Sequence, residues 1–339
     1  MLLPRSLAAL ELSGALRTDG SSPCQPLRLL SEVAPDPCSE FHLVEQPGSA
    51  VAPSDAATTE TRWLGYGRKQ WLLASLVSAG VIAGGSISTF LETPRQTFHW
   101  ASEGFFGRDT YAGGADKASH FVDYAIVTKE LANLYGVMGF SRRDAILMSA
   151  GVATLTGLVF EIGDGTNIYG FAWQDLTMDV LGVGTAALIS ALELDDLLGF
   201  RHGFLVPPPQ HDVCCAVEGP GRDYSNEIYT ADLHIAGLAR RLSLNVGPLR
   251  YLLLSLTYGS KGYPHGLPEL RERQVGLEIG LNFKVILDDL GVGRNTWWGY
   301  SLHVVFDNLR IPFTSVGVRY DLNHHKWIGP DNGNGYAAR

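Results

Sequence analysis

An uninterrupted apolar stretch at residues 71–91, WLLASLVSAGVIAGGSISTFL, constrains the fold of this chain more than any other feature. None of its positions is charged, and a helix of this length, at about 1.5 Å per residue, spans the hydrocarbon core of a bilayer. Arg62, Arg68 and Lys69 precede it, which places its N-terminal side in the cytoplasm by the positive-inside rule. The stretch predicts either a membrane anchor or a cleaved export signal, and in both cases the chain that follows is exported.

Composition narrows the class of protein further. The chain has 339 residues, of which 45% are hydrophobic, enough for more than one structured unit. Its net charge of −9 argues against a protein that follows the phosphate backbone of a nucleic acid, so no nucleic-acid binding is expected. The four cysteines, Cys24, Cys38, Cys214 and Cys215, form no CxxC pair, which excludes a zinc ribbon or a thioredoxin motif.

The sequence pattern divides the chain into four parts. Residues 1–62 are rich in proline and lack a periodic apolar face, which predicts a disordered tail or a start assigned upstream of the true one. Residues 63–198 are predicted to hold the membrane anchor and a helical bundle. Residues 199–223, with PPPQ and the paired cysteines, are predicted to be a linker, and residues 224–325 an antiparallel β domain.

Within the second part, three helical patterns follow the apolar stretch, at about 115–138, 142–162 and 173–198. Gly80 and Gly84 in the apolar stretch have the spacing of small residues at close helix contacts. The fold class predicted is therefore α+β, with a membrane-associated helical bundle followed by a C-terminal antiparallel β-sheet or partial barrel.

The strand signal is strongest at residues 274–283, QVGLEIGLNF, where every odd position is apolar and every even position is polar or glycine. Residues 315–322 repeat the alternation. Such a period of two indicates a strand with one buried face, which predicts buried odd positions and exposed even positions. The same alternation occurs in outer-membrane strands, so a partial barrel that contacts lipid is the alternative to an extramembrane sheet.

Polar groups on the apolar helices are the candidate functional residues. Pairs four residues apart share one face of a helix, and short connections bring the ends of successive helices together. We therefore expect carboxylates and an imidazole to meet near one end of the bundle, with Lys117 beside the cluster because it points about 100° away from its neighbour Asp116. The candidate metal ligands are Asp116, His120, Glu161 and Asp175, and the candidate ligand-binding residues are Lys117, Asp123, Asp164 and Asp179.

Three interpretations of this cluster remain open. The first is a buried polar network that fixes helix packing. The second is a metal site, for which Zn or Mn would suit the Asp, Glu and His ligands, although no cofactor is certain. The third is a metal-free acid–base or binding site for an anionic lipid or glycan fragment, in which Lys117 contacts the anion.

The motifs DKASHF at 116–121, EIGDG at 161–165 and WQDLTMDVLG at 173–182 carry a family resemblance. In this order they resemble the predicted periplasmic lipoproteins of the YfiM type, over residues 105–195. More loosely they resemble the VanZ-like membrane proteins, whose pattern is DKxxHF, a Glu, and Dxxx(N/D)xxG. Asp179 stands where the VanZ-like pattern usually has Asn. Neither resemblance implies an established reaction.

The function predicted is that of a bacterial cell-envelope protein, associated with a membrane and with most of the chain outside the cytoplasm. Both the inner and the outer membrane are compatible with the pattern. The leading hypothesis is that the helical domain binds or organises an envelope component, with membrane lipid, other envelope proteins or a lipid-linked glycan as partners. One alternative is a membrane-embedded metal-dependent hydrolase or transferase acting on a lipid-linked phosphate or glycan, and another is a passive envelope assembly factor. Whether the protein is an enzyme stays open.

Overall fold

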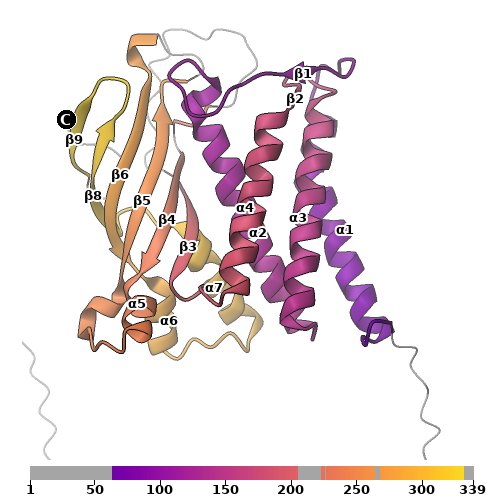
Figure 1. The fold of residues 1–339 in the computed structure, drawn as a ribbon, viewed down its shortest axis with the longest axis vertical. Coiled ribbons are helices and arrows are strands. Elements are labelled where there is room, and N and C mark those ends of the chain that lie inside the picture. Colours follow the sequence, from indigo (N-terminus) through magenta and orange to yellow (C-terminus); the bar gives the residue numbers. More distant parts are fainter. Residues whose placement is uncertain (1–62, 205–222, 226, 264–267, 332–339) are drawn as a thin grey trace, which may run out of the picture. The chain divides into compact units, whose positions relative to one another are not determined.

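The computed structural model describes residues 63–204, 223–225, 227–263 and 268–331. All of them belong to one unit of the chain, Thr58–Arg339. The predicted tail at residues 1–62 and most of the predicted linker lie outside the described residues. The described part holds a helical bundle followed by a mainly antiparallel sheet that does not close, so the predicted α+β class is confirmed (Figure 1).

Four long helices form the bundle: α1 (Arg68–Leu91), α2 (Ala115–Val137), α3 (Arg142–Asp164) and α4 (Trp173–Ala191). They pack as the pairs α1–α3, α2–α3, α2–α4 and α3–α4. Of the described helices, α1 and α3 are long and apolar enough to cross a membrane. A short parallel pair, β1 (Trp100–Ala101) with β2 (Phe171–Ala172), joins the loop before α2 to the loop before α4.

Local sequence explains where these helices begin and how they approach one another. The Ser141 side chain accepts a hydrogen bond from the backbone N–H of Asp144 and caps the start of α3. The close approach of α1 to α3 occurs at Gly85, where an added Cβ would lie 2.7 Å from the Thr156 side chain. Gly80 and Gly84 have no such neighbour within 4 Å among the described atoms, so the contact predicted at these two glycines is wrong.

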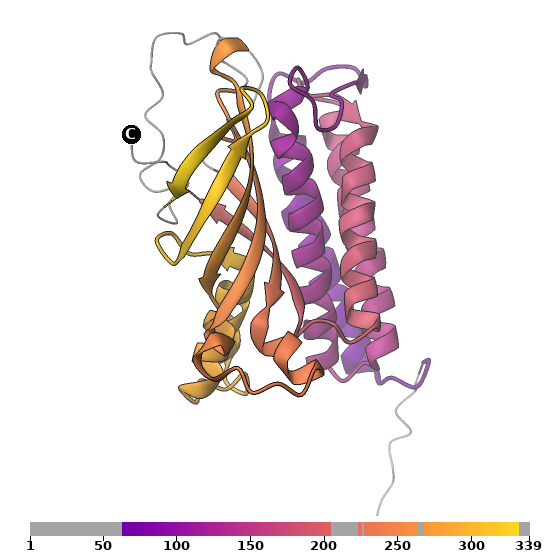
Figure 2. The same ribbon diagram turned by 60° about the vertical axis from the view of Figure 1, so that its left-hand side comes forward.

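The sheet has the strand order β7-β3-β4-β5-β6-β8-β9, in which only the β3–β7 pair is parallel. Strand β3, next to the short edge strand β7, contacts α2, the bundle helix that packs against the sheet (Figures 1 and 2). The strands are β3 (Leu198–Phe204), β4 (Glu227–His234), β5 (Leu252–Lys261), β6 (Glu272–Leu281), β7 (Leu309–Arg310), β8 (Ser315–Asp321) and β9 (Lys326–Asp331).

Shorter helices lie between the strands and were not predicted. They are α5 (Ile235–Arg241), α6 (Phe283–Asp289), α7 (Trp297–Asn308) and the 3₁₀ turns η1 (Tyr111–Gly114), η2 (Gly247–Tyr251) and η3 (Pro268–Leu270). The predicted third helical pattern ends early, because Glu193 adopts a positive φ of 58° after α4. The predicted linker is wrong at its start, because its first residues form β3 and pair with β4.

The sheet faces are opposite to the prediction. In β6, Leu277 is 55% exposed and Ile279 is 51% exposed, whereas Glu278 is 1% exposed. The alternation itself is correct, but the polar even positions are the buried ones. The polar face is buried because the sheet curls around it. The curling brings Arg310 on β7 to Glu278 on β6, where the two side chains form a hydrogen bond of 2.9 Å. In a flat sheet these strands, four positions apart, would be separated by about 19 Å.

Candidate functional site

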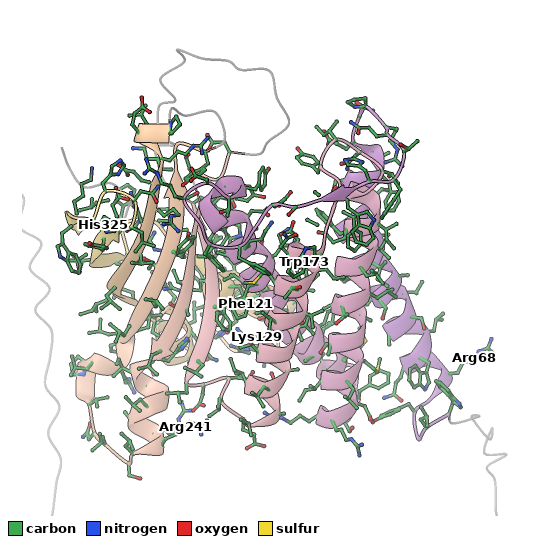
Figure 3. The ribbon with its side chains drawn as sticks, turned by 45° about the horizontal axis from the view of Figure 1, so that its top comes forward. Arg68, Phe121, Lys129, Trp173, Arg241 and His325 are labelled. Carbon is green, nitrogen blue, oxygen red and sulfur yellow. The ribbon has the colours of Figure 1, made fainter. Side chains whose placement is uncertain are left out.

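The candidate site lies at the end of the bundle where α2 begins, α3 ends and α4 begins (Figure 1). Figure 3 labels Trp173, the first residue of α4, at this end. Asp116 and Asp175 each occupy the first turn of a helix. Carboxylates are favoured there because the unpaired N–H groups give a helix N-terminus a partial positive charge.

Lys117 occupies the centre of the cluster and does not flank it as predicted. Its side chain is fully buried, and its Nζ forms salt bridges with Glu103, with Asp175 and, at 2.7 Å, with Asp116. The helical angle between neighbouring residues was estimated correctly, but the four-carbon lysine side chain is long enough to turn back toward Asp116. One cation thus neutralises three carboxylates in part, and it is not among the residues that line the neighbouring cavity.

His120 connects this group to the carboxylates of α3 and α4. Its Nδ1 lies 2.7 Å from Oδ1 of Asp179, and its Nε2 lies 3.8 Å from Oδ1 of Asp116. Two sets of donor atoms share this imidazole, and within each set the atoms lie within 4.8 Å of one another. One set joins His120 with Asp116 and Asp175, and the other joins it with Glu161 and Asp179. The four candidate metal ligands are therefore divided between two sets that share His120, and Asp179 belongs to the set with Glu161.

Two buried carboxylate oxygens in the second set lack a hydrogen-bond partner among the described residues: Oε1 of Glu161 and Oδ2 of Asp179. The other Glu161 oxygen, Oε2, accepts a hydrogen bond of 3.0 Å from the backbone N–H of Ala172. Glu161 is 1% exposed and Asp179 is fully buried. Such unpaired buried oxygens are unfavourable, so each indicates a proton, a water or a cation as the partner.

Gly157 on α3 makes room for the Asp179 carboxylate. A Cβ at position 157 would lie 2.4 Å from Oδ2 of Asp179, which is far inside van der Waals contact. The carboxylate therefore packs directly against the backbone of α3. Only glycine at position 157 leaves enough space for this contact.

A cavity of about 680 Å³ opens beside His120, Asp116 and Asp175, whereas Glu161 and Asp179 are not among the residues that line it. Its volume is in the range of sites that hold small molecules. Its wall is mainly acidic and aromatic, so it favours a cation or a polar neutral group over an anion. Among the residues that line it are Glu103, Asp116, His120, Asp123, Asp164 and Asp175, with Tyr111, Tyr124 and Tyr224.

Burial and mutual charge control protonation in this cluster. Burial raises the pKa of Asp175 to about 9, although the charges of His120 and Lys117 oppose the rise. Burial likewise raises the pKa of Glu103 above its ordinary value. For Lys117, burial favours the neutral amine, but the carboxylates of Asp116, Asp175 and Glu103 outweigh it and raise the pKa. The cluster thus holds Lys117 charged while protons compete for its carboxylates.

The other two candidate ligand-binding residues lie at the rim of the cavity. Asp123 is partly exposed, and its Oδ1 lies 2.9 Å from Nδ1 of His202 on β3. Asp164 accepts a hydrogen bond of 2.8 Å from the side chain of Asn167 in the loop after α3. Both line the cavity without joining the two sets of donor atoms around His120.

Sequence reasoning missed Glu103 and Tyr224. Glu103 lies in the loop before α2 and pairs with Lys117, while the Tyr224 hydroxyl donates a hydrogen bond to Asp116 from the start of the sheet region. Neither belongs to a helical pattern. The acidic residue in an otherwise aromatic and glycine-rich loop was a weak signal for Glu103, and the sequence held no signal for Tyr224, which reaches the site only through the tertiary fold.

The part of the chain that holds the site matches the model of a protein family. Residues 102–191 match the model of a family described as "Predicted periplasmic lipoprotein (DUF2279)". The match covers about a quarter of the chain, including α2, α3 and α4 and all eight candidate residues. It fits the resemblance to periplasmic lipoproteins and a cell-envelope location, and it gives no support to the VanZ-like resemblance. Neither the curated proteins nor the solved structures gave a match.

Proposed function

We propose that this chain is an envelope protein whose helical domain binds an envelope component in the acidic cavity, through a divalent cation held by His120, Glu161 and Asp179. The observation that carries the proposal is that Glu161 and Asp179 each hold a buried carboxylate oxygen without a described partner, and that each residue offers a carboxylate oxygen within 4.8 Å of the other and of a ring nitrogen of His120. A cation would satisfy both oxygens at once.

The donor chemistry favours Zn or Mn. Imidazole nitrogen and carboxylate oxygen are ordinary ligands of both ions, whereas Mg usually keeps several waters. Ligands about 2.1 Å from a tetrahedral ion lie about 3.4 Å from one another. The separations of up to 4.8 Å therefore have to shorten by little more than an ångström. Three protein ligands leave a coordination position for a group of the bound component.

Asp116, Asp175 and Lys117 play a supporting part in this proposal. Lys117 offsets the charge of the carboxylates that face it, so the first set of donors, His120 with Asp116 and Asp175, is already neutralised in part. The set with Glu161 and Asp179 has no comparable lysine among the described residues that contact it. A single ion is therefore assigned to the second set, with Asp116 close to the other nitrogen of His120.

The test is the metal content of the full chain, purified in a mild detergent after growth with Zn and Mn. We expect about one equivalent of one of these ions, determined by mass spectrometry. The isosteric variants Asp179→Asn and Glu161→Gln should each lower the content at least tenfold, as loss of a direct ligand does. Asp144→Asn is the matched control, because Asp144 lies on α3 at the end away from the site and should leave the content unchanged.

Two results would contradict the proposal. A folded protein that takes up no ion under these conditions would leave the cluster as a polar network that fixes helix packing. Metal that stays bound in both Asp179→Asn and Glu161→Gln would belong to another part of the chain. Gly157→Ala is a further probe, because its methyl group displaces the Asp179 carboxylate without removing it.

Metal-dependent hydrolysis or transfer on a lipid-linked phosphate is the second candidate function, and the cavity beside the donor atoms favours it. An ion with an open position lowers the pKa of bound water and orients a phosphate. Lys117 does not fit the role of anion contact, because it is buried and held by three carboxylates. Turnover of a lipid-linked pyrophosphate that requires the added metal and is lost in Asp179→Asn would establish this function over binding alone.

A further inference from the structure

The outward face of the sheet carries two aliphatic rows that cross three neighbouring strands. The strand register aligns Leu254 on β5 with Ile279 on β6, and Ile279 with Val316 on β8. The next row aligns Leu256 with Leu277, and Leu277 with Val318. The six side chains are between 40% and 58% exposed. A soluble protein seldom presents so continuous an aliphatic surface to water.

The inward face shows that this orientation is built into the sequence. Glu278 accepts hydrogen bonds from both Arg310 and Arg319, at 2.9 and 2.8 Å. Deeper in the same face, Arg201 binds both oxygens of Asp232, at 2.6 and 3.1 Å. These charged groups are buried and paired. If the sheet were turned over to bury the aliphatic rows, the bonds between these charged groups would have to break.

An aromatic row borders the aliphatic rows on one side. Tyr258 on β5 aligns with Val275 on β6, which aligns with Tyr320 on β8, which aligns with Trp327 on β9. The rings of Tyr320 and Trp327 lie 5.2 Å apart, and Trp327 is 72% exposed. Tyrosine and tryptophan gather where a hydrocarbon region meets water, because their rings are apolar and carry one polar group.

The dimensions of the face fit a bilayer. β5 and β6 each have ten residues, the length of a tilted membrane-crossing strand. On the same face, the positions from Leu252 to Tyr258 cover about 20 Å along β5, which at a tilt of about 45° spans about 14 Å of the roughly 25 Å apolar band of outer-membrane barrels. The helices α1 and α3 in the same unit are also long enough to span a membrane.

The geometry points to acyl chains of a lipid bilayer as the occupant of this face, along β5, β6 and β8. A second copy of the chain is the other occupant to consider. Protein interfaces usually contain about one hydrogen bond per 100–200 Å². The two rows consist only of Leu, Ile and Val, which offer no side-chain group to pair with or to set a register. This inference does not depend on metal binding by the helical domain.

Site-directed fluorescence on the full chain tests this contact. The four cysteines are replaced by serine, and single variants Leu277→Cys, Ile279→Cys and His325→Cys are labelled with an environment-sensitive dye. His325, labelled in Figure 3, lies in the turn between β8 and β9 and is the exposed control. Each variant is reconstituted into vesicles of phosphatidylethanolamine and phosphatidylglycerol, with a trace of spin-labelled lipid, and is compared with and without iodide.

We expect the dyes at positions 277 and 279 to be quenched by the spin-labelled lipid and shielded from iodide, with the reverse result at position 325. Iodide quenching at 277 and 279 equal to that at 325 would mean that water covers the face and would overturn the inference. Shielding from both quenchers, together with disulfide cross-linking between two Leu277→Cys chains, would assign the face to a second copy and would overturn it as well.

A second measurement does not depend on the dye. Leu277→Arg, at an exposed position, should leave the polar inward face intact and the secondary structure unchanged. Its partition into the same vesicles should fall about thirtyfold, because a basic residue on the lipid face of a β-barrel is disfavoured to about that extent. Leu290→Arg, at an exposed leucine after α6 and outside the two rows, is the matched control with unchanged partition. Equal partition of both variants would contradict lipid contact at position 277.

Discussion

Adjacent residues of β6 offer a sharp comparison, because Leu277 and Glu278 point to opposite faces of the sheet. Glu278 is 1% exposed and accepts hydrogen bonds from Arg310, Arg319 and Ser315. The change Glu278→Gln keeps the size of the side chain and removes its charge. Two buried guanidinium groups then face a neutral amide, one of whose hydrogen-bonding groups is a donor that neither arginine can accept.

The expected cost follows from this geometry. Removing one partner of a buried ion pair typically destabilises a protein by about 3–5 kcal/mol, because the remaining charge stays buried without compensation. Leu277→Ala removes a side chain that is already 55% exposed. Its cost should be about 1 kcal/mol or less, since burial of a whole leucine side chain contributes about 1.5–3 kcal/mol. The larger change in stability is thus predicted at the polar residue.

The assay is denaturant unfolding of the full chain in a mild detergent, followed by tryptophan fluorescence and far-ultraviolet circular dichroism. A double-mutant cycle with Arg319→Gln adds an internal check. The combined variant should cost less than the sum of the single variants by about 1–3 kcal/mol, because each single variant leaves the other partner unpaired. A larger loss of stability in Leu277→Ala than in Glu278→Gln would refute the assignment of the two faces.

Three further predictions concern the helical bundle. Gly182→Ala should destabilise the protein by about 1–3 kcal/mol in the same unfolding assay, because the added Cβ would lie 2.2 Å from the carbonyl oxygen of Phe121. Gly184→Ala, whose Cβ would have no described atom within 4 Å, should be neutral or stabilising. Lys117→Met should cost about 3–5 kcal/mol at alkaline pH and less as the pH falls through about 9 in a pH series of thermal melts, because burial raises the pKa of Asp175 to about 9 and the carboxyl group that faces Lys117 takes up a proton there. A reporter fused after residue 100 should be active outside the cytoplasm, and activity of a cytoplasmic reporter there would reverse the orientation.

The helices could be predicted because their signals are local. The 21-residue apolar stretch and the helical patterns that follow it are both read from residues that are close together in the sequence. Spacing of four residues correctly placed Asp116 and His120 on one face. Connection lengths then indicated that Glu161 and Asp175 would come near them, and the structure places their donor atoms in two overlapping sets around the imidazole.

Other parts of the site depend on tertiary contacts that local spacing does not describe. The direction of a Cα–Cβ bond predicts the face of Lys117, but its ammonium group lies several bonds farther on and follows the carboxylates. Tyr224 reaches Asp116 across more than a hundred residues of sequence. Such contacts depend on how the sheet region packs against α2, and no periodic pattern in either segment encodes that packing.

The sheet faces were assigned wrongly because alternation shows only which residues share a face. Which of the two faces is buried depends on the surroundings of the sheet. The helices show the same inversion. The buried residues of α1 are Ala74, Ser86 and Thr89, while Leu72 and Leu76 are exposed. In α1 and along β5, β6 and β8, small or polar side chains are buried and large aliphatic side chains are exposed. In water this arrangement would lose the stabilisation that comes from burying large apolar side chains. In lipid the hydrophobic effect does not drive helices together, and polar side chains form hydrogen bonds with one another instead. Lipid around α1 and along β5, β6 and β8, as proposed above for the sheet, would give the pattern of the helix and that of the sheet the same physical cause.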